Sequence, residues 1–110
     1  MGLEFTGRPD REGAAVYFIS DGTTSSTQEL QSIAQVVDVQ LPDEAQVVLL
    51  DGKGREGSEV SDFYDLAKLP AVLIVMDDDQ LYQSWSAPLP NAEDILYAMG
   101  QAGVRLRGDQ

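Results

Sequence analysis

Hydroxyl side chains gather in one short segment of this chain, residues 20–27, which we call the hydroxyl loop. The segment has the sequence Ser-Asp-Gly-Thr-Thr-Ser-Ser-Thr and separates an apolar run from a helical pattern. A helix start leaves several backbone N–H groups without partners, so such a segment can bind an anion. The same hydroxyls can instead cap the helix, and each cap is worth about 1 kcal/mol. The carboxylate of Asp21 would repel an anion, which favours capping.

The residue types give little support for acid–base catalysis, metal binding or dinucleotide binding. The chain has no histidine, the commonest general base, and no cysteine. Three consecutive aspartates at 77–79 could offer oxygens to Ca²⁺, but they lack the spaced ligands of a loop site, so we expect a solvated turn. Gly52, Gly54 and Gly57 indicate a flexible loop, because their spacing does not fit a dinucleotide fingerprint. We predict no catalytic residue, no cofactor and no metal.

The charge of the chain limits its partners. The formal net charge is −12, and between residues 12 and 104 sixteen acidic side chains stand against Lys53, Arg55 and Lys68. Such a body repels phosphate backbones and anionic lipids, so we expect neither nucleic acid nor a membrane as partner. The acidity serves solubility or matches a basic protein partner. Residues 1–6 lack the basic start and apolar core of a secretory signal, which predicts a cytoplasmic protein.

The apolar pattern predicts an alternation of strands and helices. Buried strands are expected at 14–19, 46–50 and 71–76, and an edge-like strand at 80–86. The first helix should begin within the hydroxyl loop and end at Pro42. Ser58 should cap a second helix, with an apolar face that includes Val60 and Phe63 and with its end at Pro70. Asn91 should cap the third, which Gly103 ends.

The resulting order is β-α-β-α-β-β-α, an α/β fold. The two strand–helix crossovers require a parallel pair of strands, and the short turn at 77–79 requires an antiparallel hairpin. We therefore expect a mixed four-stranded sheet with helices on both faces. This single domain should cover residues 14–103, between a flexible N-terminal arm at 1–13 and a C-terminal tail at 104–110.

This order, with a proline directly before the third strand, resembles the thioredoxin-like fold over residues 14–103. In that family the proline follows a cis peptide bond and faces the catalytic loop across a shallow groove. The resemblance implies a cis bond at Leu69-Pro70. It also puts Thr23 and Ser26 at the positions of the two active-site cysteines. An alcohol cannot form a disulfide, so the resemblance implies a redox-inactive member without thiol–disulfide exchange.

Three further positions depart from the family's pattern. Tyr17 stands where the family has a buried acid, Gly22 where it has a tryptophan, and Ala87 where it has a glycine near the substrate groove. In the family, an extended substrate pairs with the backbone before the proline. The resemblance thus implies a protein or peptide partner, which a basic character would suit. The contact residues would be Gly22, Thr23, Thr24, Ser25, Ser26, Leu69, Pro70 and Ala87.

Two other functions remain open at this stage. The chain could be a structural subunit of an assembly, or it could bind a small anion of the glutathione type at the start of the first helix. The sequence does not predict an oligomeric state.

Overall fold

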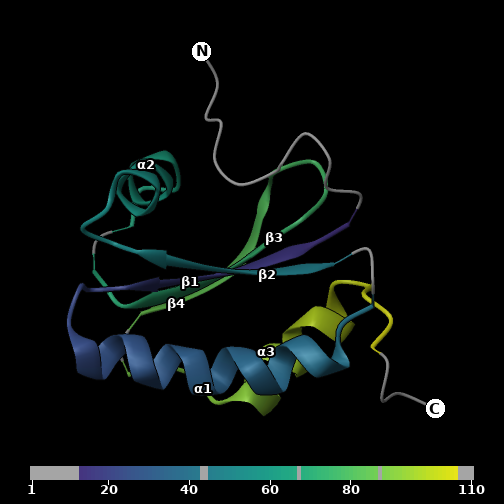
Figure 1. The fold of residues 1–110 in the computed structure, drawn as a ribbon. Helices are drawn as coiled ribbons and strands as arrows, with labels where there is room; N and C mark the ends of the chain where they lie inside the picture. The colour runs from purple at the N-terminus through teal and green to yellow at the C-terminus, as the bar shows by residue number, and fades with distance from the viewer. Residues whose placement is uncertain (1–12, 43–44, 67, 87, 107–110) are drawn as a thin grey trace.

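The computed structural model describes residues 13–42, 45–66, 68–86 and 88–106, and its fold is α/β, with three helices and one four-stranded mixed sheet (Figure 1). The elements follow the predicted order: β1 (Ala15–Ser20), α1 (Thr24–Gln40), β2 (Gln46–Asp51), α2 (Arg55–Phe63), β3 (Ala71–Val75), β4 (Leu81–Ser86) and α3 (Ala92–Gln101). Most of the predicted arm and tail falls outside the described residues. No helix within the described ranges is both long and apolar enough to cross a bilayer.

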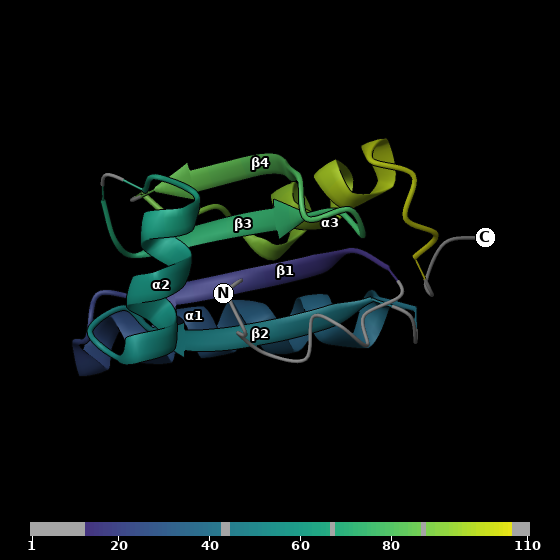
Figure 2. The same cartoon turned by 90° about the horizontal axis from the view of Figure 1, so that it is seen from above.

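The strands lie side by side in the order β2-β1-β3-β4 (Figure 2). β1 runs parallel to β2 and antiparallel to β3, and β3 is antiparallel to β4. The parallel pair and the antiparallel hairpin are therefore confirmed. The prediction that residues 46–50 form a buried strand is wrong, because β2 lies at an edge and Leu49 is 46% exposed.

Helices cover both faces of the sheet, α1 and α3 on one and α2 on the other (Figure 1). Side chains alternate along β1, so Val16 and Phe18 pack under α1 and α3, whereas Tyr17 and Ile19 pack on the α2 side. Because β1 is central and covered on both faces, its unbroken apolar run is what a doubly buried strand requires. Two small cores result, one on each side of the sheet.

The ends of α1 and α3 are confirmed. Thr23 is the N-cap of α1, and its side chain accepts a hydrogen bond from the Ser26 N–H. Asn91 accepts one from the Asp94 N–H at 2.8 Å and caps α3 in the same way. Gly103 has φ of +95° directly after that helix, the conformation for which a glycine C-cap is favoured.

The predicted bounds of α2 are wrong at both ends. The helix begins at Arg55 after Gly54, so Ser58 lies inside it, and it ends at Phe63, seven residues before Pro70. Val60 is buried as expected, but Phe63 is 54% exposed. The start is set by packing rather than by a side-chain cap: a Cβ at Gly57 would collide with the Asp51 carbonyl oxygen, so α2 lies directly against the end of β2.

Candidate functional site

The topology collects three loops at one end of the sheet. β1 and β2 are parallel, so their C-terminal ends coincide, and Ser20 pairs with Asp51. β3 runs the opposite way and begins at the same end, where Ala71 pairs with Ile19. Pro70 therefore lies next to the strand end from which the hydroxyl loop departs. The register thus brings together the two segments that the resemblance assigned to one site.

Leu69 and Pro70 form one side of this site. The Leu69-Pro70 peptide bond is cis, as the resemblance implied, and both residues are half-buried. Within the described ranges, no residue hydrogen-bonds to the backbone of Leu69. On the other side of β3, Ala71 pairs with Ser86 of β4. Ala87, the eighth predicted contact residue, lies outside the described residues.

A closed set of hydrogen bonds holds the hydroxyl loop. Thr23 Oγ1 donates to Asp21 Oδ1 at 2.7 Å and accepts from the Ser26 N–H at 3.2 Å. The buried Ser26 Oγ accepts in turn from the Asp21 N–H at 3.3 Å, and Thr27 Oγ1 donates to the Thr23 carbonyl at 2.8 Å. The hydroxyls of Thr23 and Ser26, which the resemblance aligns with the two cysteines, are thus engaged in holding the turn. This observation favours the capping role.

Thr24 and Ser25 differ from their neighbours. Both side chains are exposed, and neither forms a hydrogen bond to another residue of the described ranges. They occupy the first turn of α1, between the N-cap Thr23 and the buried Ser26. These two side chains therefore form the outward surface of the hydroxyl loop, which a partner could contact without breaking the hydrogen bonds that shape it.

Asp21 gives the start of α1 an anion of its own. Hydrogen bonds from Thr23, first from its hydroxyl and then from its backbone N–H, hold the pKa of the Asp21 carboxyl below its usual value of 3.8. The ionised carboxylate thus interacts with the N-terminal end of α1, where the helix dipole is positive. A second anion there would meet its negative charge.

Two residues that the sequence analysis did not assign to the site support it from the next loop. Gly22 has φ of +92°, and a Cβ placed on it would lie 2.6 Å from Lys53 Cδ, so the lysine chain lies across this glycine. A Cβ on Gly52 would collide with Leu69 Cδ1 and with the Ser20 carbonyl oxygen. The loop at 51–54, which we call the glycine loop, is therefore closely packed rather than flexible. The parallel pairing of the two preceding strands is the signal that could have predicted this contact.

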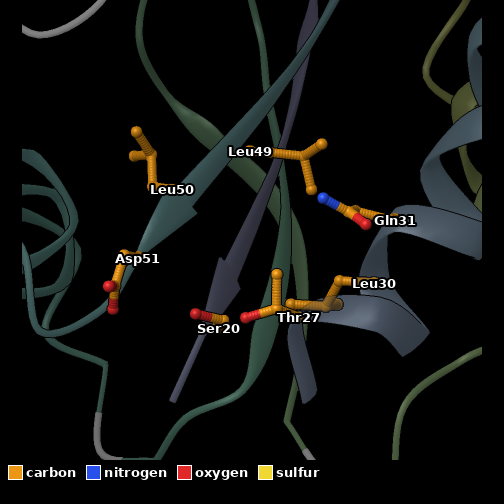
Figure 3. A pocket seen from close by; sticks show the side chains of 7 residues that line it. All are labelled: Ser20, Thr27, Leu30, Gln31, Leu49, Leu50 and Asp51. Atoms are coloured by element: carbon orange, nitrogen blue, oxygen red, sulfur yellow. The ribbon is translucent and has the colours of Figure 1, made fainter. Parts of the chain in front are cut away.

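A hollow of about 260 Å³ opens beside the hydroxyl loop, between α1 and β2. In Figure 3 the side chains of Gln31 and Leu49 extend toward one another across it. Its lining residues are Ser20, Thr27, Leu30, Gln31, Leu49, Leu50 and Asp51. Elsewhere, among the described residues, no three carboxylates come close enough to hold a metal ion. The aspartates at 77–79 form the turn between β3 and β4.

Comparison with known proteins supports the architecture and adds no activity. The chain matches no family model and no curated protein. It is similar to a solved structure described as the crystal structure of a designed protein, with a TM-score of 0.60 and 12% sequence identity. The match covers 84% of this chain and 78% of the other. At this identity the likeness concerns the fold alone.

Proposed function

We propose that this chain is a redox-inactive thioredoxin-like domain that binds an extended segment of a protein or peptide partner, between the 23–26 part of the hydroxyl loop and Pro70. One observation carries the proposal: within the described residues the Leu69 backbone has no hydrogen-bond partner, beside a loop with an outward surface free for contact. An extended segment can pair with such a backbone by strand addition.

The chemistry of the loop supports binding rather than catalysis. Thr23 and Ser26 cannot exchange disulfides, and each already accepts a hydrogen bond within the loop. An activated hydroxyl would need a base within hydrogen-bond reach. Thr23 Oγ1 does contact the Asp21 carboxylate, but the lowered pKa of that carboxyl makes it a weaker base than an ordinary aspartate. The same carboxylate disfavours a small anion as ligand at this helix end.

Selection of peptides from a displayed random library tests the proposal, followed by affinity measurement with two variants. Ser25→Arg adds a long side chain to the exposed surface of the hydroxyl loop. This substitution should lower the affinity for the selected peptide about tenfold or more, as expected for loss of a central contact. Ser32→Arg makes the same change at another exposed position of the same helix and should have little effect. Equal affinities for the two variants, or a library that yields no binder, would contradict the proposal.

A further inference from the structure

We infer that the outer edge of β2, the sheet edge opposite β4, is a second docking site, which takes an extended basic segment of a partner protein as an added strand. The inference does not depend on the function proposed above. It combines an edge with outward backbone groups, a trough beside that edge, and the charge around the trough.

The direction of the backbone groups follows from the pairing with β1. The Gln46 N–H donates to the Ala14 carbonyl at 3.1 Å, and the Gly52 N–H donates to the Ser20 carbonyl at 2.9 Å. The backbone N–H and C=O groups of successive residues point to opposite sides of a strand. The backbone groups of Gln46 and Gly52, six residues apart, therefore point toward β1, and so do those of Val48 and Leu50.

The backbone groups of the intervening residues of β2 therefore point away from β1, toward the outer edge of the sheet. These residues are Val47, Leu49 and Asp51, and among the described strands none pairs with this edge. The Asp51 carbonyl already accepts from the Gly54 N–H at 2.8 Å. The N–H and C=O groups of Val47 and Leu49 are thus the ones that an added strand would meet.

Two adjoining hollows form a trough along this edge. The first is the hollow of Figure 3, and the second, of about 400 Å³, continues it along α1 toward the start of β2. Gln31 and Leu49 line both hollows. The second is lined by Gln31, Ala34, Gln35, Asp38, Val47 and Leu49. Alternate side chains of an added strand would enter this trough, because side chains alternate between the two faces of a sheet.

The charge around the trough selects a basic occupant. Asp38 and Asp51 are exposed carboxylates that line it, and its described lining includes no basic side chain. Of the two cations that follow β2, Arg55 pairs with Glu59 at 3.5 Å and Lys53 lies across Gly22. A second copy of this chain, with its net charge of −12, would be repelled, whereas lysine or arginine side chains would be attracted.

The two edge strands of the sheet, β2 and β4, differ in how regularly they pair with their neighbours. Proteins commonly protect an edge strand with lysine, proline or a bulge. The six residues of β2 contain no lysine or proline, and their pairing with β1 is regular. The pairing of β4 with β3 is irregular between Ile74 and Val75. Leu81 on β4 is 38% exposed, close to the 46% of Leu49, which makes it a matched control position.

A short acetylated peptide of alternating lysine and valine, added to the full chain, is the probe. Amide hydrogen exchange should slow at Val47 and Leu49 when the peptide binds and should not change at Val48 and Leu50. Leu49→Lys should weaken binding about tenfold by placing a like charge in the trough, while Leu81→Lys should have little effect. Asp38→Asn, which removes only a charge, should weaken binding less. Ser25→Arg should have no effect.

Four results would overturn the inference. They are unchanged exchange at Val47 and Leu49 with saturating peptide, equal weakening by Leu49→Lys and Leu81→Lys, equal binding of a glutamate–valine peptide, and protection of this edge by self-association without any peptide. A loss of binding in Ser25→Arg alone would place the peptide at the Leu69 site instead. Thermal melting of each variant shows whether it is folded, and Asp38→Asn tests the charge even if Leu49→Lys is unstable.

Discussion

The hydroxyl loop and the glycine loop lie at the same end of the sheet, but different interactions determine their conformations. The hydroxyl loop is shaped by side chains, through the hydrogen bonds among Asp21, Thr23 and Ser26. The glycine loop is shaped by the absence of a side chain, because a Cβ at Gly52 would collide with its neighbours. The first loop therefore keeps its shape while presenting exposed side chains, and the second serves as its support. This difference is why we assign binding to the hydroxyl loop.

The largest expected effect lies where α2 packs on the glycine loop. Gly57→Ala should destabilise the protein by about 1–3 kcal/mol, because the new methyl group meets the Asp51 carbonyl oxygen and the backbone must move. Gly100→Ala is the matched control in α3, where nothing lies within 4 Å, and it should stabilise by roughly 0.5–1 kcal/mol. Urea unfolding measures both. Stabilisation by both substitutions would contradict the close packing of α2 against the end of β2.

Gly22→Ala tests the junction between the two loops. Its φ of +92° disfavours any side chain, so we expect a loss of about 1–2 kcal/mol. The contact with Lys53 Cδ should add little, because the far part of a lysine side chain can move aside. Thermal unfolding in the Lys53→Ala background separates the two causes. Full recovery of stability in the double variant would mean that the contact, not the backbone, sets the cost.

Thr23→Ala tests the shape of the hydroxyl loop itself. Loss of the cap and of the hydrogen bond to Asp21 should destabilise the protein by about 1 kcal/mol, and Thr23→Ser should recover most of it. Asn91→Ala, which removes the corresponding cap of α3, gives a reference value in the same protein. Chemical unfolding measures all three. An unchanged stability in Thr23→Ala would contradict the structural role that we give to this hydroxyl.

The smallest effect concerns the exposed carboxyl of Asp21. Its pKa in the folded protein is lower than its usual value of 3.8, so its contribution to stability is present above that value. The contribution is lost as the pH falls through the lowered pKa. A carboxyl titration followed by NMR should give an Asp21 midpoint below 3.8, and Thr23→Ala should raise it toward 3.8. A midpoint unaffected by Thr23→Ala would contradict the assigned cause.

Local chemistry explains what the sequence could predict. Thr23 and Asn91 cap their helices through bonds to residues three positions away, so the printed order of residues suffices to find them. The start of α2 could not be found in this way, because Ser58 is an equally good cap and only the packing of Gly57 on Asp51 decides against it. The apolar run of β2 likewise does not distinguish a central strand from an edge strand partly covered by a helix.

The candidate site was predictable to the same extent. The resemblance is what placed the hydroxyl loop beside Leu69-Pro70, and the observed strand order and directions bring these two segments to the same end of the sheet. Gly52 and Lys53 were missed, since Gly52 packs on Ser20 and Lys53 on Gly22, and each of these pairs is more than thirty positions apart in the sequence. The hollow between α1 and β2 had no signal in the sequence, because it arises from how the helix lies over the edge strand.

Hydrogen exchange of the Leu69 amide, with and without a peptide selected against the native chain, tests the central claim most directly. We expect exchange at this amide to slow by about tenfold or more when the peptide binds, because its N–H gains a partner in the added strand. An unchanged rate at Leu69, measured with the peptide at saturation, would contradict the proposed pairing of a partner segment with Leu69.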